Sequence, residues 1–132
     1  MQTRTPNTAR VLLLALLTLT AGCGWIYEFG IGVRNMTAEE RDHVEVQFGP
    51  LVEKFGVLGV GSTAVNFGTQ APVPDVGVVR WESRNGVRHQ KGVAVRRAVP
   101  RGFRDDVIFF DIEPGEIVMV RVQPRPGKGR TR

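Results

Sequence analysis

Cysteine is almost absent from this chain, and its scarcity excludes several classes of small protein. Cys23 is the only cysteine, so no disulfide can form within the chain and a disulfide-stapled scaffold is excluded. Structural zinc sites use three or four Cys or His ligands at characteristic spacings. Here the only histidines are His43 and His89, and no Cys-x-x-Cys or His-x-x-x-His pattern occurs. We therefore expect no metal and no cofactor.

Serine is also scarce, and the usual signatures of nucleophilic catalysis are missing. Ser62 and Ser83 are the only serines, and neither lies in a nucleophile elbow. The loop around Gly59 and Gly61 lacks the helix and lysine that follow a phosphate-binding loop. A catalytic site assembled from distant residues would need two or more polar side chains to converge in a cleft. The candidates are Asp105, Asp106, Asp111, Glu113, His89 and Arg104. We expect a protein that is not an enzyme.

No run of about 20 apolar residues is present, which is the length that a transmembrane helix needs. The longest apolar segment, residues 11–20, reads VLLLALLTLT and follows a stretch that contains Arg4 and Arg10 but no acid. A basic segment followed by a short apolar segment is typical of an export signal. The sequence therefore predicts that residues 1–22 direct export.

The residues that follow the apolar segment indicate which kind of export signal this is. Leu19-Thr20-Ala21-Gly22-Cys23 resembles the lipobox of bacterial lipoproteins, although the position of Thr20 is more often Leu. The resemblance implies cleavage before Cys23, a diacylglyceryl group on its thiol and acylation of the new amino group. Two or three acyl chains anchor a protein stably, whereas one chain binds a bilayer only marginally. The alternative is an ordinary secretory signal in which Cys23 has no role.

Lipidation of Cys23 would make a membrane the first partner of the protein. It implies a location in the cell envelope. By resemblance to the sorting rule of enteric bacteria, Gly24 in place of Asp implies the outer membrane if the source is Gram-negative. An envelope protein is a possible second partner, whose identity the sequence does not give.

Charge is nearly balanced in the part of the chain that is expected to fold. Residues 23–120 contain 11 basic and 13 acidic side chains, which gives a net charge of −2. The excess of the whole chain, +5, therefore comes from the signal and from residues 121–132, which contain five basic side chains and no acid. A nucleic-acid-binding protein concentrates positive charge on one folded face. We expect no nucleic-acid partner.

One basic cluster lies in the middle of the chain and has two interpretations. Arg96, Arg97, Arg101 and Arg104 lie close together in sequence, and Asp105-Asp106 follow them directly. The cluster is either a solvated strand end balanced by the two acids, or a surface that contacts anionic lipid headgroups or another envelope polyanion.

Glycine and proline are plentiful, and they divide the chain into short segments. Sixteen Gly and eight Pro separate runs of alternating or continuous apolar character. Asn85-Gly86 predicts a hairpin with a two-residue type I′ turn. Only residues 37–42 look helical, with Thr37 and Glu40 spaced as in a capping box. We predict strands at residues 31–33, 44–48, 51–55, 64–67, 76–82, 87–97, 107–112 and 117–122.

Seven or eight short strands in about 100 residues predict an all-β fold, an antiparallel β-sandwich. A small closed barrel is the alternative. Val33-Arg34-Asn35, the alternating Val44, Val46 and Phe48, and the later Leu58-x-x-Gly61-Ser62 together resemble Ig-like modules of bacterial surface proteins. This resemblance covers residues 31–67. Trp81 is similar to the core Trp of Ig domains, but the cysteines that flank it there are absent here.

The whole chain resembles small bacterial lipoproteins with a single β-domain, a resemblance that assigns no activity. It predicts a signal peptide over residues 1–22, a lipidated N-terminus and short tether over 23–30, an Ig-like β-sandwich over 31–123 and a basic disordered tail over 124–132. We expect a membrane-anchored envelope lipoprotein that acts as a non-enzymatic binding or assembly module. The alternative is a carrier that holds a small apolar ligand in a cavity of the barrel or sandwich.

Overall fold

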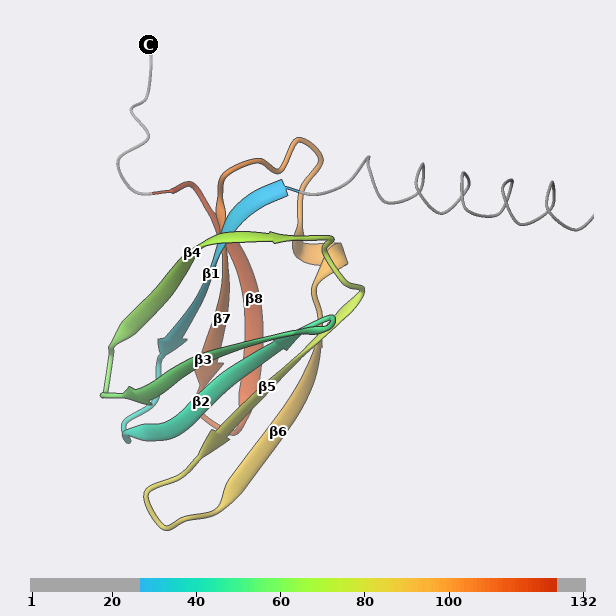
Figure 1. Ribbon diagram of the computed structural model, residues 1–132. Coiled ribbons are helices and arrows are strands. Elements are labelled where there is room, and N and C mark those ends of the chain that lie inside the picture. Colours follow the sequence, from blue (N-terminus) through green and yellow to red (C-terminus); the bar gives the residue numbers. More distant parts are fainter. Residues whose placement is uncertain (1–26, 126–132) are drawn as a thin grey trace, which may run out of the picture.

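The computed structural model describes residues 27–125 as an all-β fold, which confirms the predicted class. Cys23, the expected signal and residues 126–132 of the expected tail lie outside the described residues. Apart from the 3-10 turn η1 (Arg96–Ala98), the described segment contains only strands and connections (Figure 1). The strands are β1 (Tyr27–Asn35), β2 (Arg41–Phe48), β3 (Leu51–Leu58), β4 (Thr63–Ala71), β5 (Val76–Glu82), β6 (Arg88–Ala94), β7 (Val107–Glu113) and β8 (Ile117–Gln123). Within this segment, no helix has the length and apolar character to cross a bilayer.

The strands form two four-stranded sheets, with the orders β4-β1-β7-β8 and β3-β2-β5-β6. Every pairing is antiparallel except that of β1 with β7, which is parallel. Antiparallel pairing was expected throughout, so the expectation is wrong at this one pair. The reason is that β1 and β7 are far apart in sequence, and no tight turn forces them to run in opposite directions.

Two local expectations also need correction. β1 begins at Tyr27, so the strand takes in part of the segment assigned to the tether. Residues 37–42 form no helix, and β2 begins at Arg41. The Thr37 hydroxyl donates to Asn35 Oδ1 at 2.6 Å, and this local bond closes a turn at the point where a capping box would start a helix.

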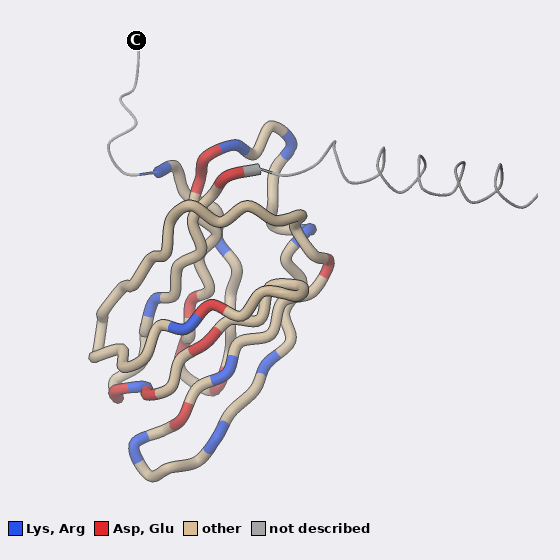
Figure 2. Tube along the Cα trace, viewed as in Figure 1, with Lys and Arg blue, Asp and Glu red and all other residues tan. Residues whose placement is uncertain are grey.

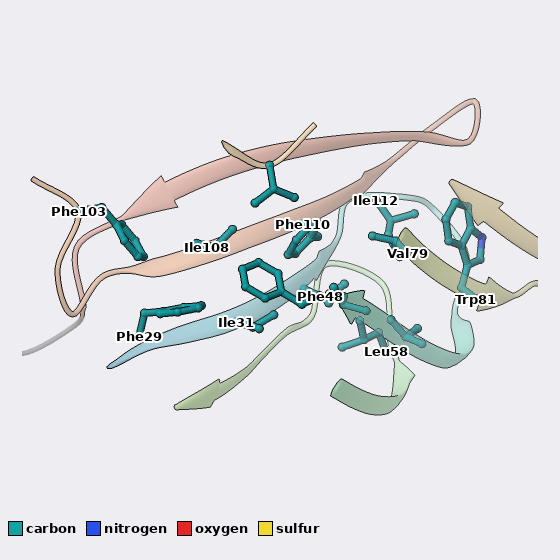
Figure 3. Packing of buried hydrophobic residues seen from close by; sticks show 14 residues of the cluster. Phe29, Ile31, Phe48, Leu58, Val79, Trp81, Phe103, Ile108, Phe110 and Ile112 are labelled. Atoms are coloured by element: carbon teal, nitrogen blue, oxygen red, sulfur yellow. The ribbon is translucent and has the colours of Figure 1, made fainter. Parts of the chain in front are cut away.

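The core lies between the two sheets and receives side chains from both (Figure 3). On each central strand, alternate residues point inward, as the alternation in the sequence predicts. The centroid of the Phe29 ring lies 5.5 Å from that of Phe48, which belongs to the other sheet, and 5.5 Å from that of Phe103. The buried apolar residues that complete this cluster are Ile31, Val33, Val44, Val46, Leu58, Val79, Trp81, Val95, Ile108, Phe110 and Ile112.

The strand directions give the fold two ends with different connections (Figure 1). β1 and β7 both begin at the end that we call the N-terminal pole, which carries the connections 49–50, 72–75 and 95–106. The opposite end, the distal pole, carries the connections 36–40, 59–62, 83–87 and 114–116. The chain enters the described fold and leaves it at the N-terminal pole (Figure 1).

Strand β7 is covered on both faces, because side chains of its own sheet fold over its outer side. Phe109 points outward, yet it is only 6% exposed. Its ring lies over Gly32 of the neighbouring strand, where a Cβ atom would come within 2.6 Å of the ring. The guanidinium of Arg34 covers the same ring, 4.4 Å from its centroid. Glycine at position 32 is therefore required by packing.

Replacing this glycine should destabilise the fold. Gly32→Ala places a methyl group against the Phe109 ring, and overpacking of this kind costs about 1–3 kcal/mol. The measurement is the free energy of unfolding from urea denaturation.

Gly92→Ala is the matched control, since a Cβ at that strand position meets nothing closer than 3.7 Å. Its free energy of unfolding should stay within about 0.5 kcal/mol of the parent. Equal stability of the two variants would show that Phe109 does not pack on Gly32.

Candidate functional site

The hairpin that joins β5 to β6 determines which side chains meet at the distal pole. Its loop contains three residues, 84–86, because Ser83 N–H donates to the Val87 carbonyl at 2.8 Å. Gly86 N–H closes the turn by donating to the Ser83 carbonyl at 2.8 Å. Among the loop residues only Gly86 has a positive φ, +80°. The predicted two-residue type I′ turn is therefore wrong, although the hairpin is where it was expected.

This extra loop residue changes the face on which His89 lies. With a two-residue turn at 85–86, His89 would pair with Glu82, and its side chain would point to the outer face. In the observed register it pairs with Trp81, and a shift of one residue moves every side chain to the other face. The His89 ring therefore stacks on the buried Trp81 ring, with centroids 5.3 Å apart and planes 16° apart.

His89 connects a serine on one side to a carboxylate on the other. Ser83 Oγ lies 2.5 Å from His89 Nε2, and His89 Nδ1 lies 2.8 Å from Glu116 Oε1. The tautomer with its proton on Nδ1 satisfies both contacts, because Nε2 then accepts from the hydroxyl while Nδ1 donates to the carboxylate. These residues come from the end of β5, from β6 and from the turn between β7 and β8.

These three side chains line a pocket of about 440 Å³ at the distal pole. Glu39 and Arg41 also line it, and Arg41 Nη1 donates to Glu39 Oε2 at 3.2 Å. The Arg41 Nε atom is buried and has no hydrogen-bond partner within the described residues. We call this site the distal pocket. Arg84, Asn85 and Val87 complete its lining, so it combines a hydroxyl, an imidazole, an amide, two carboxylates and two guanidinium groups.

Asn35, which is fully buried, holds the connections of the distal pole together. Its Nδ2 group lies within 2.8–3.1 Å of the carbonyl oxygens of Glu39, Leu58 and Gly59. Its Oδ1 accepts from the Thr37 amide and hydroxyl. One amide thus fixes the 36–40 connection, and with it Glu39 of the distal pocket, against the 59–62 connection.

The polar residues singled out in the sequence do not converge. His89 lies at the distal pole, whereas Arg104, Asp105 and Asp106 lie in the connection that precedes β7, at the N-terminal pole. Sequence reasoning missed Ser83 and Glu116 as neighbours of His89. The Asn85-Gly86 hairpin was the signal from which this contact could be predicted. It places His89 on the inner face of the sheet only if the loop has three residues.

Asp111 belongs to a separate ion cluster on the outer face of its sheet. Its side chain is 3% exposed and accepts from Arg34 through two bonds of 2.6 and 2.9 Å. Arg121 Nε lies 3.1 Å from Asp111 Oδ2, the oxygen that also accepts from Arg34 Nη2. Arg121 also reaches Glu113 at 3.5 Å. The cluster ties β1, β7 and β8 together, so Asp111 has a structural role.

The N-terminal pole carries the basic cluster of the sequence. Arg96, Arg101 and Arg104 line a pocket of about 500 Å³, together with apolar residues that include Val73 and Val99. Figure 2 shows basic positions along the connection that leads from η1 to β7, close to the start of β1. The ion pair of Arg96 with Asp75 is long, 3.5 Å, and exposed, so it contributes little to stability.

His43 lines neither the distal pocket nor the pocket at the N-terminal pole. It lies on an exposed bulge of β2 and has a φ of +47°. Its Nδ1 lies 3.4 Å from Asp42 and 3.2 Å from Glu82. In residues 27–125, no group of three or more His, Cys, Asp and Glu side chains is placed to hold a metal ion.

No family model and no curated protein matches this chain. Among solved structures, the chain is similar to a protein from Eubacterium rectale determined by NMR, with 14% identity and a TM-score of 0.48. The similarity covers 76% of this chain and 91% of that one. At this TM-score it assigns neither a family nor a function.

Removing the Asp111 carboxylate should destabilise the protein. Asp111→Asn leaves Arg34 without its charged acceptor and Arg121 with only its longer contact to Glu113. A hydrogen bond to a charged group contributes about 1.5–3 kcal/mol. The free energy of unfolding, measured by urea denaturation, should fall by this amount.

Asp75→Asn serves as the control, because it breaks the exposed pair with Arg96 at the N-terminal pole. It should cost less than about 1 kcal/mol. If both variants lose the same stability, the Asp111 cluster does not hold its three strands together.

Proposed function

We propose that this protein is a cell-envelope lipoprotein, anchored by lipid on Cys23, whose β-domain acts as a binding or assembly module close to the bilayer. The observation that carries the proposal is the position of the first strand. β1 begins at Tyr27, four residues after Cys23, and four residues span at most about 14 Å. A lipid on Cys23 would therefore hold the N-terminal pole next to the membrane surface.

The chemistry of the N-terminal pole supports this orientation. Arg97, Arg101 and Arg104 are exposed there, on the same connection whose Asp106 carbonyl accepts from Gly30 of β1 at 2.9 Å. Near an anionic lipid surface, each such cation contributes about 1 kcal/mol of attraction. Asp105 and Asp106 offset part of this charge, so the lipid on Cys23 supplies most of the membrane affinity and the arginines orient the domain.

In this orientation the edges and the distal pole remain available to an envelope partner. β8 is an edge strand of its sheet and displays the exposed apolar side chains of Ile117 and Met119. An exposed edge can accept an added strand from another protein through main-chain hydrogen bonds. These features support an assembly role for the domain.

The alternative of an apolar-ligand carrier gains no support from the core. The space between the sheets is occupied by large side chains, of which Phe48 and Phe110 are fully buried. Phe29 and Phe103 pack against each other at its N-terminal end. A carrier needs an apolar cavity there, so we favour the binding module.

We also propose that the fold is Ig-like. The pairs β1–β4, β2–β5 and β5–β6 match the B–E, C–F and F–G pairs of Ig domains. In this correspondence Trp81 lies on β5, the equivalent of strand F, whereas the core tryptophan of Ig domains lies on strand C. The first sheet differs from that of an Ig domain, because no strand takes the place of D beside β4 and β8 lies outside β7. β7 lies beside β1, where an Ig domain has strand A, and it runs parallel to β1.

The anchor is tested by the intact mass of the protein isolated from a membrane fraction. We expect the mass of the chain that begins at Cys23 plus two or three acyl chains. The comparison is Cys23→Ser, which should remain unprocessed because the modified thiol is absent.

An unacylated mass, or a soluble protein cleaved at another position, would contradict the proposal. Cys23 would then be either removed with the signal or left as a free thiol. A soluble role in the periplasm or medium would replace the anchored one.

A further inference from the structure

We propose that Ser83, His89 and Glu116 form a nucleophilic site that hydrolyses small carboxylic esters. This activity goes beyond the binding role, and it contradicts the expectation from sequence that the protein is not an enzyme. That expectation depended on the absence of a nucleophile, a base and an orienting group near one another. The fold brings all three together at the distal pole.

The connectivity of the three groups matches the roles that acyl transfer requires. The hydroxyl oxygen of Ser83 contacts Nε2 of His89 at 2.5 Å, where the imidazole can take its proton. The carboxylate of Glu116 contacts the other ring nitrogen at 2.8 Å, where it fixes the tautomer and stabilises the imidazolium that forms. Such sites are recognised by this geometry and not by the order of the residues in the chain.

The imidazole is held in place from a third direction. Trp81 is 2% exposed, and its ring stacks almost parallel on the His89 ring. The His89 side chain itself is 15% exposed, so its ring has little freedom to turn away from Ser83. A base that is held by packing and by a carboxylate needs little rearrangement before it reacts.

The backbone at Glu116 is also unusual for a residue with a side chain. Its φ is +60°, in the left-handed region that favours glycine and in which other residues are uncommon. Residues held in such conformations cluster at functional sites. Here the residue in this conformation is the one whose carboxylate contacts His89.

The distal pocket provides room for a substrate and a donor for the charge that develops on it. Its volume of about 440 Å³ lies within the range of small-molecule sites. Two guanidinium groups, those of Arg41 and Arg84, line the same pocket. A guanidinium in this pocket can stabilise the oxyanion of a tetrahedral intermediate.

The reaction follows from these positions. Ser83 Oγ attacks the ester carbonyl carbon while His89 Nε2 takes the hydroxyl proton. The bond from that carbon to the alkoxy oxygen then breaks, and His89 returns the proton to the departing alcohol, which leaves an acyl group on Ser83. Water attacks this acyl group, again with proton transfer through His89, and releases the carboxylic acid and free Ser83. The sum is ester plus water to acid plus alcohol.

The test uses a fluorophosphonate probe and p-nitrophenyl acetate with the full-length protein in detergent. Trypsin places the two serines in different peptides, since Ser83 falls in residues 81–84 and Ser62 in residues 55–80. We expect the label on Ser83, approaching one per chain. Ser83→Ala should abolish labelling and reduce ester hydrolysis to the background rate, whereas the matched control Ser62→Ala should change neither.

The other two groups are tested by rates. His89→Ala should slow labelling by about 100-fold or more, which is the usual contribution of a general base. Glu116→Gln should slow it by at least about tenfold, and Glu116→Asp should recover part of the rate, because orientation by a carboxylate is lost in the first variant and kept in the second. The urea midpoint of each variant separates lost chemistry from lost fold.

A second pair of variants keeps the proposal falsifiable if Ser83→Ala does not fold. Ser83→Cys should react with iodoacetamide faster than Ser62→Cys, because a neighbouring imidazole promotes the thiolate. Absence of labelling, labelling of Ser62, hydrolysis unchanged in Ser83→Ala, or equal alkylation of the two cysteine variants would each overturn the proposal. Labelling by the fluorophosphonate and ester hydrolysis do not depend on lipidation of Cys23, and alkylation is measured on the peptide that contains position 83 or 62, so a free Cys23 thiol does not contribute to it.

Discussion

The parallel pairing of β1 with β7 is the constraint on which the rest of the structure depends. Because the two strands run in the same direction from Gly30↔Val107 to Asn35↔Ile112, both begin at one pole. The long connection 95–106, which delivers the chain to β7, must therefore end beside the start of β1. This places the arginine-rich connection next to the proposed anchor and sends every loop of the distal pocket to the opposite end.

The same pairing links stability to the distal pocket. β7 lies between β1 and β8, is buried on both faces, and is held to its neighbours by the Asp111 ion cluster and by the Phe109 ring on Gly32. The turn that follows β7 carries Glu116, and its sheet faces the one that contains β6 and His89. The contact between carboxylate and imidazole thus depends on how the two sheets stack, so a rigid core serves a site made from their ends.

The sequence was sufficient for the fold class, because alternation such as Val44, Val46 and Phe48 and the many turn residues reflect local physics. It could not show which strands would be neighbours within each sheet, and for this reason the parallel pair of β1 and β7 was not predicted. The distal pocket was not predicted because the loop between β5 and β6 has one residue more than expected. A two-residue turn at Asn85-Gly86 and the observed three-residue loop are both compatible with the sequence. Only the three-residue loop brings His89 beside Trp81 and Ser83. The lipidation of Cys23 is predicted from local sequence alone, and this residue lies outside the described residues.

The central claim is that the N-terminal pole faces the bilayer and the distal pole faces away. Once Cys23 is acylated, an introduced cysteine is the only free thiol, so Arg101→Cys and Asn85→Cys can each carry one spin label in the lipidated protein. The two positions lie at opposite ends of strands that are roughly 25 Å long. The measurement is the accessibility of each spin label to two relaxing agents, in vesicles of phosphatidylethanolamine and phosphatidylglycerol. The label at position 101 should be accessible to oxygen, which concentrates in the bilayer, and shielded from a water-soluble nickel chelate. The label at position 85 should show the reverse. Equal accessibility, or a label at 85 closer to the lipid, would contradict the account.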